Sequence, residues 1–412
     1  MELVIRNARL ADGTGGPAPV DIGIAGGRIV AIEPRIAADA KTYDAAGRLA
    51  CAGLIETHIH LDKARIIDRC TPQPRASLSP VKGVTPLKPA MTVEDVRERA
   101  RRTIEDCIRH GTTRMRTQLE VDPGIGMRGF EAVQSLADEF RWAIDIEICV
   151  FAQEGLISYP GTDELLVEGL KRGAKLIGGA PRYDKDPAGQ IDRVFQLARE
   201  FDVDIDLHLD VGTTADHMDI HQVRELTERY RRGGRVTVGH MAKLSLMPPR
   251  DVEALGRRLA DCGIAVTVLP ATDLFLMGRD RDHKVPRGVA DANLLLGQGV
   301  NCSLSTNNVL NPATPYGDCS LIRVANLYAN VLQLDRQNEL DECFRMLTDR
   351  SARLMNCSDY GIAVGNPADI VVIDAVSGAE AIAQIAQPVA AFKRGRQTMH
   401  WPTPQIIAPD AR

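Results

Sequence analysis

From residue 53 to residue 304, short apolar runs alternate with amphipathic stretches of helical length. Residues 93–111 (VEDVRERARRTIEDCIRHG) and 191–201 (IDRVFQLAREF) repeat apolar positions at helical spacing. Eight alternating units predict an α/β fold of the closed (β/α)8 TIM-barrel type. An open, doubly wound sheet has similar local patterns and stays the alternative. The expected strands are 53–58, 113–120, 146–152, 175–180, 203–208, 235–240, 264–269 and 299–304.

The two ends of the chain have a different pattern, with brief β-prone runs separated by Gly, Pro and Asp. Near the start these runs are 2–6, 20–24 and 28–32, and near the end they are 365–375 and 389–401. We therefore expect the two distant segments to form one small β-sandwich domain. The predicted division is residues 1–55 for its first part, 56–358 for the barrel and 359–412 for its second part.

Composition limits the classes of partner. The 412 residues are 44% hydrophobic and 25% charged, and the formal net charge is −5. These values are typical of a globular protein and give no electrostatic reason to expect nucleic acid or a membrane surface. The chain has no apolar run long enough for a membrane span, and its nine cysteines include no CxxC pair. We expect a cytoplasmic protein with reduced thiols and a small, weakly charged substrate.

Four of the nine histidines close expected strands. His58 and His60 end the first strand and share one face, while His208 ends the fifth and His240 the sixth. The reactive face of such a barrel lies at the carboxyl ends of its strands. Imidazoles from separate strands can converge on one divalent ion and leave a coordination position for water. A single strand-end histidine is more often a hydrogen-bonded core residue, but four at these positions favour a metal site.

Six segments, in this order, carry a family resemblance: THIHLDK, FAQEGLISYPG, DIDLHLD, VTVGH, NVLNPATPYGD and DYGIAVGNPADIVVI. Together they resemble the amidohydrolase superfamily, and within it the cytosine deaminase-like branch, which includes aminohydrolases of triazine-type rings. The resemblance spans nearly the whole chain. It implies a metal-bearing (β/α)8 barrel joined to a β-sandwich made from both chain ends.

The resemblance also implies roles for individual residues. His58, His60 and His208 match the family's metal ligands, and His240 matches the histidine that contacts the hydrolytic water and the substrate. Gln153 matches a glutamine that binds the ring edge of the substrate. Its amide can donate and accept at once, which suits a ring with adjacent C=O and N–H groups.

Two positions depart from the family pattern. Val211 stands where these deaminases have the glutamate that shuttles protons, and Asn307 stands where they have an aspartate that binds metal and helps to deprotonate water. Asn308 likewise replaces a neighbouring acid. A valine cannot move a proton, and an amide oxygen coordinates a cation more weakly than a carboxylate. We keep Asn307 as a metal-ligand candidate and take Asp210 as a candidate acid/base, beside His240.

The leading hypothesis is a metal-dependent hydrolase of a C–N bond in a small cyclic amide, amidine or aminated heterocycle. The cofactor would be one divalent ion, zinc or iron first and manganese as the alternative. Because of Val211 and Asn307, a catalytically silent homologue that binds a heterocycle stays open, as does a metal-assisted hydrolase with a different leaving group. We expect Lys63 to form a salt bridge beside the site, and a homo-oligomer from the resemblance alone.

Overall fold

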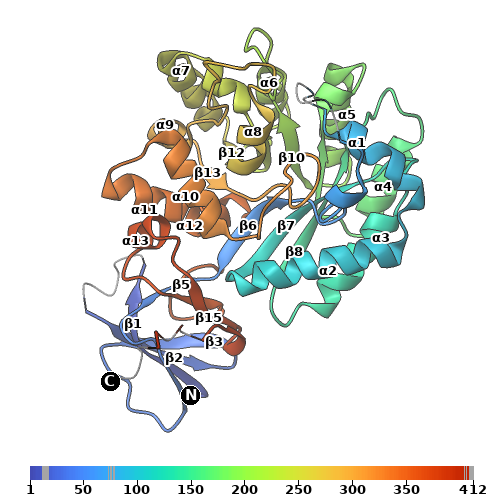
Figure 1. Ribbon diagram of the computed structural model, residues 1–412. Helices are drawn as coiled ribbons and strands as arrows, with labels where there is room; N and C mark the ends of the chain where they lie inside the picture. Colours follow the sequence, from blue (N-terminus) through green and yellow to red (C-terminus); the bar gives the residue numbers. More distant parts are fainter. Residues whose placement is uncertain are drawn as a thin grey trace.

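The computed structural model describes residues 1–407 apart from 12–17, 73, 75–76, 78, 403 and 405. Two sheets organise the chain, a barrel and a smaller terminal sheet (Figure 1). The barrel sheet holds eight parallel strands in sequence order, which confirms the predicted (β/α)8 fold. Its strands are β6 (Leu54–Ile59), β7 (Thr112–Glu120), β8 (Asp145–Ala152), β9 (Leu176–Gly179), β10 (Asp204–Leu209), β11 (Val236–His240), β12 (Ile264–Val268) and β13 (Cys302–Leu304).

The barrel closes where its first strand meets the segment that follows its last strand. The Asn307 N–H donates to the His58 carbonyl at 2.8 Å, and the His60 N–H donates to the Asn307 carbonyl at 2.9 Å. These bonds make a parallel bridge between Ile59 and Asn307. The closure therefore runs through the HxH motif itself.

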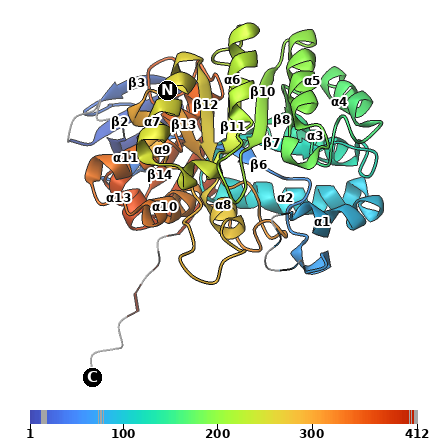
Figure 2. The same cartoon turned by 90° about the horizontal axis from the view of Figure 1, so that it is seen from above.

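Helices lie outside the ring of strands (Figure 2). In α2, Thr92 caps the amino terminus by accepting from the Asp95 N–H, and the apolar residues Val96, Ala100 and Ile104 face inward. Such helices cover the sheet, so its strands are buried on both faces. The helices are α1 (Val81–Val84), α2 (Val93–Arg109), α3 (Arg128–Glu139), α4 (Thr162–Lys171), α5 (Pro187–Glu200), α6 (Ile220–Arg229), α7 (Pro249–Asp261), α8 (Pro270–Leu276), α9 (Ala292–Gly297), α10 (Leu321–Leu332), α11 (Gln337–Arg345), α12 (Asp349–Leu354) and α13 (Gly378–Ala383).

A buried arginine crosses the barrel interior. Arg116 on β7 donates to Glu147 at 2.6 Å and to Asp206 at 3.1 Å. Both Arg116 and Asp206 are almost completely buried. A buried charge needs such partners, since an unpaired one costs several kcal/mol (~3–5) when its partner is removed. The interior is thus polar below the histidines and apolar around the helices.

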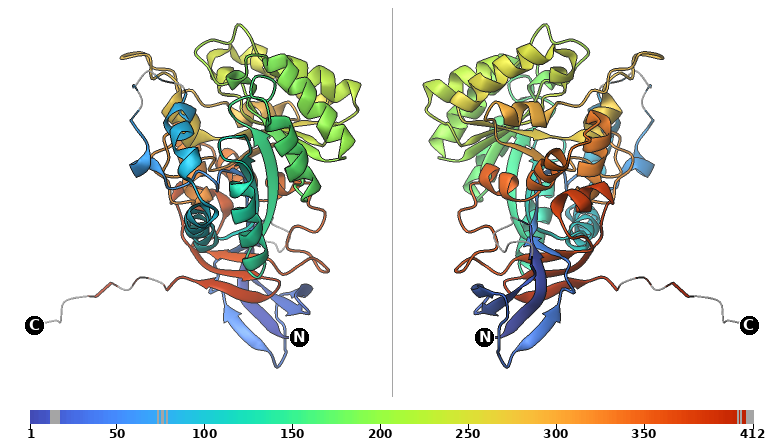
Figure 3. Two further views of the ribbon diagram at one scale, coloured as in Figure 1. Left: turned by 90° about the vertical axis from the view of Figure 1, so that its right-hand side faces the viewer. Right: turned by 90° about the vertical axis from the view of Figure 1, so that its left-hand side faces the viewer.

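Both chain ends build the terminal sheet, as predicted. Its order is β16-β15-β14-β5-β1-β2-β3, with β4 paired to β1. Lys393 on β15 donates to the Thr113 carbonyl at the start of β7 and pairs with Asp145 at the start of β8. The terminal sheet therefore lies against the amino-terminal ends of barrel strands, away from their carboxyl ends (Figure 3). The strands are β1 (Leu3–Leu10), β2 (Val20–Ala25), β3 (Arg28–Glu33), β4 (Lys41–Asp44), β5 (Leu49–Ala52), β14 (Ile370–Ile373), β15 (Pro388–Lys393) and β16 (Arg396–His400).

The domain boundaries at residues 55 and 358 stay predictions, and residues 408–412 of the third segment lie outside the described residues. Within the described part of the chain, no helix is long and apolar enough to cross a membrane.

The close contact between β9 and β10 gives a stability prediction. A Cβ added at Gly178 would lie 2.1 Å from the Asp206 carbonyl oxygen, a backbone atom that cannot rotate away. We expect Gly178→Ala to lower the free energy of unfolding by about 2–4 kcal/mol, measured as a lower thermal midpoint. Gly297→Ala in α9 is the control, because its Cβ would meet nothing within 4 Å. Equal midpoints for the two variants would contradict this account of the barrel wall.

Candidate active site

Three imidazoles meet at the carboxyl ends of β6 and β10. The Nε2 atom of His208 lies 3.0 Å from that of His58 and 3.1 Å from that of His60. His60 directs its Nδ1 to the Gln118 carbonyl at 3.2 Å, and His58 directs its Nδ1 to Asp206 at 3.5 Å. A carbonyl oxygen only accepts, so the His60 Nδ1 atom carries a proton and the His60 Nε2 lone pair faces the centre of the cluster. The His58 Nδ1 atom also meets the Gln118 Nε2 atom at 3.4 Å.

The cluster is neutral because it is buried. Burial lowers the pKa of His58, and it lowers the pKa of His60 and His208 well below the ordinary value. Lys63 and the neighbouring imidazoles lower the pKa of His60 further. Neutral imidazoles are the form that binds a metal, and these three nitrogens lie close enough together to hold one ion. The structure thus brings together the three histidines that the sequence named as ligands.

Asn307 brings an oxygen to the same cavity. It is 1% exposed, its backbone is left-handed at φ 62°, and no residue in the described part of the chain donates to its Oδ1 atom. An unpaired buried amide oxygen is costly, and a cation would satisfy it. Asn307 and the three histidines therefore fit a divalent ion as a mixed nitrogen and oxygen ligand set.

His240 ends β11 and lines the same cavity. Its Nδ1 lies 2.6 Å from the Oδ1 atom of Asp273 on α8, so Nδ1 carries the proton and Nε2 keeps its lone pair. Asp273 is fully buried. Asp273 was not identified from the sequence. Its position, five residues after the end of β12 and so near the carboxyl face of the barrel, could have indicated it.

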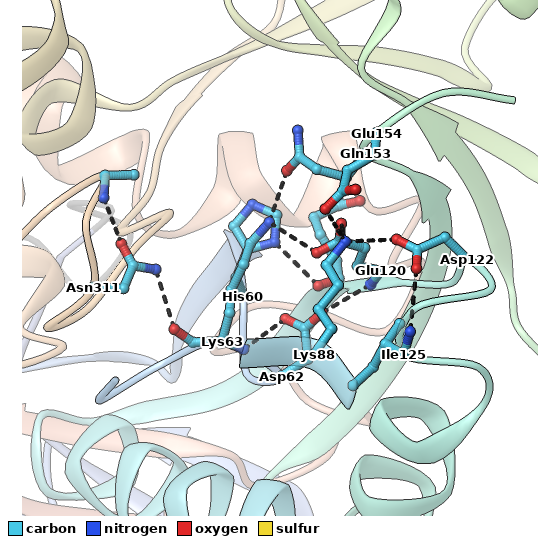
Figure 4. Close-up of polar contacts among 12 residues, drawn as sticks. His60, Asp62, Lys63, Lys88, Glu120, Asp122, Ile125, Gln153, Glu154 and Asn311 are labelled. Carbon is cyan, nitrogen blue, oxygen red and sulfur yellow. Dashed lines mark hydrogen bonds and ion pairs between the residues drawn. The ribbon is translucent and has the colours of Figure 1, made fainter. Parts of the chain in front are cut away.

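Gln153 follows β8 and meets Lys63. The Lys63 ammonium donates to the Gln153 Oε1 atom at 2.7 Å and lies 3.7 Å from Glu120, which is the salt bridge expected for Lys63 (Figure 4). Both Lys63 and Gln153 line the cavity with His60, His208 and His240. The oxygen of the Gln153 amide is therefore already occupied, although the sequence suggested that it would be free for substrate.

A second acidic group lies beside the cavity but already holds a cation. Glu120, Asp122 and Glu154 could group around an ion. The Lys88 ammonium occupies that position, since it donates to Asp122 at 2.6 Å and to both glutamates (Figure 4). Burial raises the pKa of Glu120 to about 7 even though Lys88 and Lys63 lower it. This cluster is an ion pair network rather than a metal site.

Asp210 lies outside the cavity lining. Its carboxylate accepts from the Asp219 N–H at 3.0 Å and the Ile220 N–H at 3.2 Å, where α6 begins, and Lys243 lies 3.6 Å away. Burial raises its pKa to about 6. The acid/base role predicted for Asp210 is untested, but these contacts assign the carboxylate to anchoring α6. Val211 does line the cavity.

A family model described as the amidohydrolase family matches residues 76–400, most of the chain. The chain belongs to the amidohydrolase family. The N-isopropylammelide isopropyl amidohydrolase of Pseudomonas sp. (strain ADP) is 28% identical over 406 residues, 96% of each chain. A pterin deaminase of Rhizobium rhizogenes (strain K84 / ATCC BAA-868) is 26% identical over 383 residues, 91% of this chain and 87% of the relative. The crystal structure of 5-methylcytosine deaminase from Klebsiella pneumoniae with 5-fluorocytosine matches with a TM-score of 0.93 and 27% identity, over 99% of this chain and all of that one.

These amidohydrolase relatives are hydrolases of C–N bonds, which confirms the enzyme class predicted from the sequence. Their names give three different ring substrates, so membership of the amidohydrolase family leaves the substrate open. The resemblance to the cytosine deaminase-like branch is likewise confirmed.

The Lys88 network gives a prediction for this amidohydrolase. Lys88→Met would leave the buried Glu120 and Asp122 and the partly buried Glu154 without their cation, and we expect a loss of about 3–5 kcal/mol in the free energy of unfolding. Lys82→Met, at an exposed position of α1, is the matched control. Adding Asp122→Asn to Lys88→Met removes a carboxylate that lost its cation and keeps the oxygen that accepts from the Gly124 and Ile125 N–H groups, so it should recover part of the thermal midpoint. A Lys88→Met protein as stable as the control would show that the carboxylates do not depend on this lysine.

Proposed function

We propose that this amidohydrolase is a metal-dependent enzyme that hydrolyses a C–N bond in a small nitrogen heterocycle, releasing ammonia or an amine. The observation that carries the proposal is the convergence of three imidazoles, with the His208 Nε2 atom 3.0 Å from that of His58 and 3.1 Å from that of His60, beside a cavity lined by Gln153 and His240. The three relatives act on aminated or alkylaminated rings according to their names, which supports the same class of substrate.

The proposed cofactor is one divalent ion held by the three histidines, with the Asn307 Oδ1 atom as a further ligand. Zinc and iron suit an imidazole-rich set best, and manganese is the alternative. When bound, such an ion polarises the ring and lowers the pKa of water at the open coordination position.

His240 would handle the proton. Its Nδ1–H donates to Asp273, so its Nε2 atom can accept a proton from the attacking water and return it to the leaving nitrogen. The Asp273 carboxylate would stabilise the protonated imidazole of His240. This pair would take over part of the work of the carboxylates that Val211 and Asn307 replace, and Gln153 would hold the ring in place.

A second candidate is a catalytically silent homologue that binds a heterocycle. The observation in its favour is Val211, whose side chain clusters with Ala242, Leu276 and Met277, so the cavity wall is apolar where a proton shuttle is expected. A metal-assisted hydrolase with a better leaving group is the third candidate, since such a group departs without a proton.

The metal is tested by elemental analysis of protein purified without added ions. We expect about one equivalent of zinc or iron per chain, because the three histidines form one site. His58→Ala and His208→Ala should lose it, whereas His221→Ala, at an exposed position of α6, should keep it. Wild-type protein that stays free of zinc, iron and manganese even after growth with each metal would contradict the proposed cofactor.

Turnover is tested by release of ammonia or alkylamine from a panel of aminated pyrimidines, pterins and triazines. We expect at least one substrate, with His240→Ala lowering kcat by about 100- to 10,000-fold at unchanged metal content. Bound metal without turnover of any ring would favour the silent homologue, provided that the double variant Val211→Glu/Asn307→Asp is also inactive. Activity found only in that double variant would show that the wild-type protein is inactive because it lacks these two carboxylates.

A further inference from the structure

We propose that Lys63 decides which ring edge the protein accepts, by fixing the Gln153 amide so that this amide presents its N–H groups, and not its oxygen, to the cavity. The substrate class is then a heterocycle with two neighbouring acceptors, a ring carbonyl next to an unprotonated ring nitrogen. This inference rests on the proposed function, because it assumes that the cavity binds a ring.

The orientation of the Gln153 amide follows from the chemistry of its neighbour. An ammonium group has three donors and no acceptor, so the Gln153 atom that lies 2.7 Å from Lys63 Nζ is the oxygen. The amide nitrogen then points away from Lys63, as Figure 4 shows. No described residue accepts a hydrogen bond from that nitrogen. Its N–H groups are the part of the amide left for a ligand.

Lys63 is held in place, so the amide cannot easily turn over. The Lys63 side chain lies 5.1 Å above the Phe151 ring and 3.7 Å from Glu120, whose other oxygen binds Lys88. The Lys63 backbone N–H donates to Asp62 at 2.9 Å, and its carbonyl accepts from Asn311 at 3.2 Å. Contacts on the backbone and along the side chain therefore fix the ammonium beside Gln153.

Two other amides that line the cavity, those of Asn308 and Asn311, are already used by the protein. Asn311 donates to Asn308 at 2.6 Å and accepts from the Ala313 N–H at 2.9 Å. Asn308 accepts that bond and directs its own nitrogen to Thr272 at 3.4 Å. Neither the Asn308 nor the Asn311 amide therefore has both its donor and its acceptor free to bind a ring. Lys63 and Gln153 are thus two adjacent lining side chains with N–H groups available to a ligand.

Two neighbouring donors discriminate between ring edges. An edge with a carbonyl beside an unprotonated nitrogen offers an acceptor to each, whereas a lactam edge turns its own N–H toward a donor. A buried donor without an acceptor costs about 1–3 kcal/mol. The sequence alone suggested that Gln153 reads a C=O and an N–H together; the Lys63 contact favours two acceptors instead.

The test is calorimetric binding of two rings that carry no amine and cannot be deaminated. 1-Methylpyrimidin-2-one offers a carbonyl next to an unprotonated nitrogen, and 1-methyluracil offers a carbonyl next to an N–H; the methyl group stops either ring from exchanging its edges by tautomerism. We expect wild-type protein to bind the first ring about tenfold more tightly than the second. Preference for 1-methyluracil, equal affinity or binding of neither ring would overturn the inference.

Two variants test whether Lys63 is the cause. Lys63→Met frees the Gln153 amide to turn, and Gln153→Glu removes its N–H groups, so both should reduce the preference to about onefold or reverse it. Lys171→Met, at an exposed position of α4, should keep the wild-type ratio. Retention of the preference in either site variant would overturn the role of Lys63, and Gln153→Glu keeps the test available if Lys63→Met fails to fold.

Turnover separates this inference from the proposed function. Hydrolysis of an aminated ring without any edge preference would keep the proposed function and overturn the inference. A clear edge preference in a protein that hydrolyses no ring would keep the inference and count against hydrolysis.

Discussion

The site depends on the two backbone hydrogen bonds that close the barrel between the HxH segment and Asn307. These bonds hold the HxH segment, with His58 and His60, next to the turn that follows β13 and carries Asn307. Without closure, the first and last strands of the sheet would be its two edges, and Asn307 would lie a full sheet width from the histidines. The same bonds that join the sheet therefore bring Asn307 beside the histidine cluster.

Buried charge sets the second constraint. Arg116 pairs with Glu147 and Asp206 below the histidines, and Lys88 pairs with three carboxylates beside them. Each cation is paired with carboxylates in or beside the barrel interior, where an unpaired charge is costly. The histidine cluster is different, because its buried imidazoles bring their Nε2 atoms together and no described lysine or arginine bonds to those atoms. This contrast is the physical reason for placing an ion among the histidines and not among the carboxylates.

Backbone strain is also present at the same face. His240, Asp210 and Asn307 all have a left-handed backbone, with φ of 74°, 55° and 62°. Residues with a side chain adopt this region at a cost of about 1–3 kcal/mol, and such residues cluster at functional sites. Here each one follows or ends a barrel strand, where the chain must turn sharply to aim a polar side chain or to begin the next element.

The sequence by itself determined the alternating strand and helix pattern and the positions of the four strand-end histidines. Eight apolar runs with helical stretches between them favoured a closed barrel over an open sheet, and all eight strands appear within a few residues of their expected positions. A histidine at the end of such a run must lie at the carboxyl face, so His58, His60, His208 and His240 could be named from pattern alone.

Contacts between distant segments were decided only by the tertiary structure. Asp273 meets His240 from a helix that follows β12, and Lys63 meets Gln153 from 90 positions away along the chain. Lys88 binds Glu120 at the end of β7 and Glu154 just after β8. Asp210 shows the reverse case, since its place two residues after His208 suggested the cavity but its carboxylate anchors α6. Strand periodicity fixes which face a residue lies on, whereas the direction of a side chain beyond the strand end depends on the loop and on the partner that it meets there.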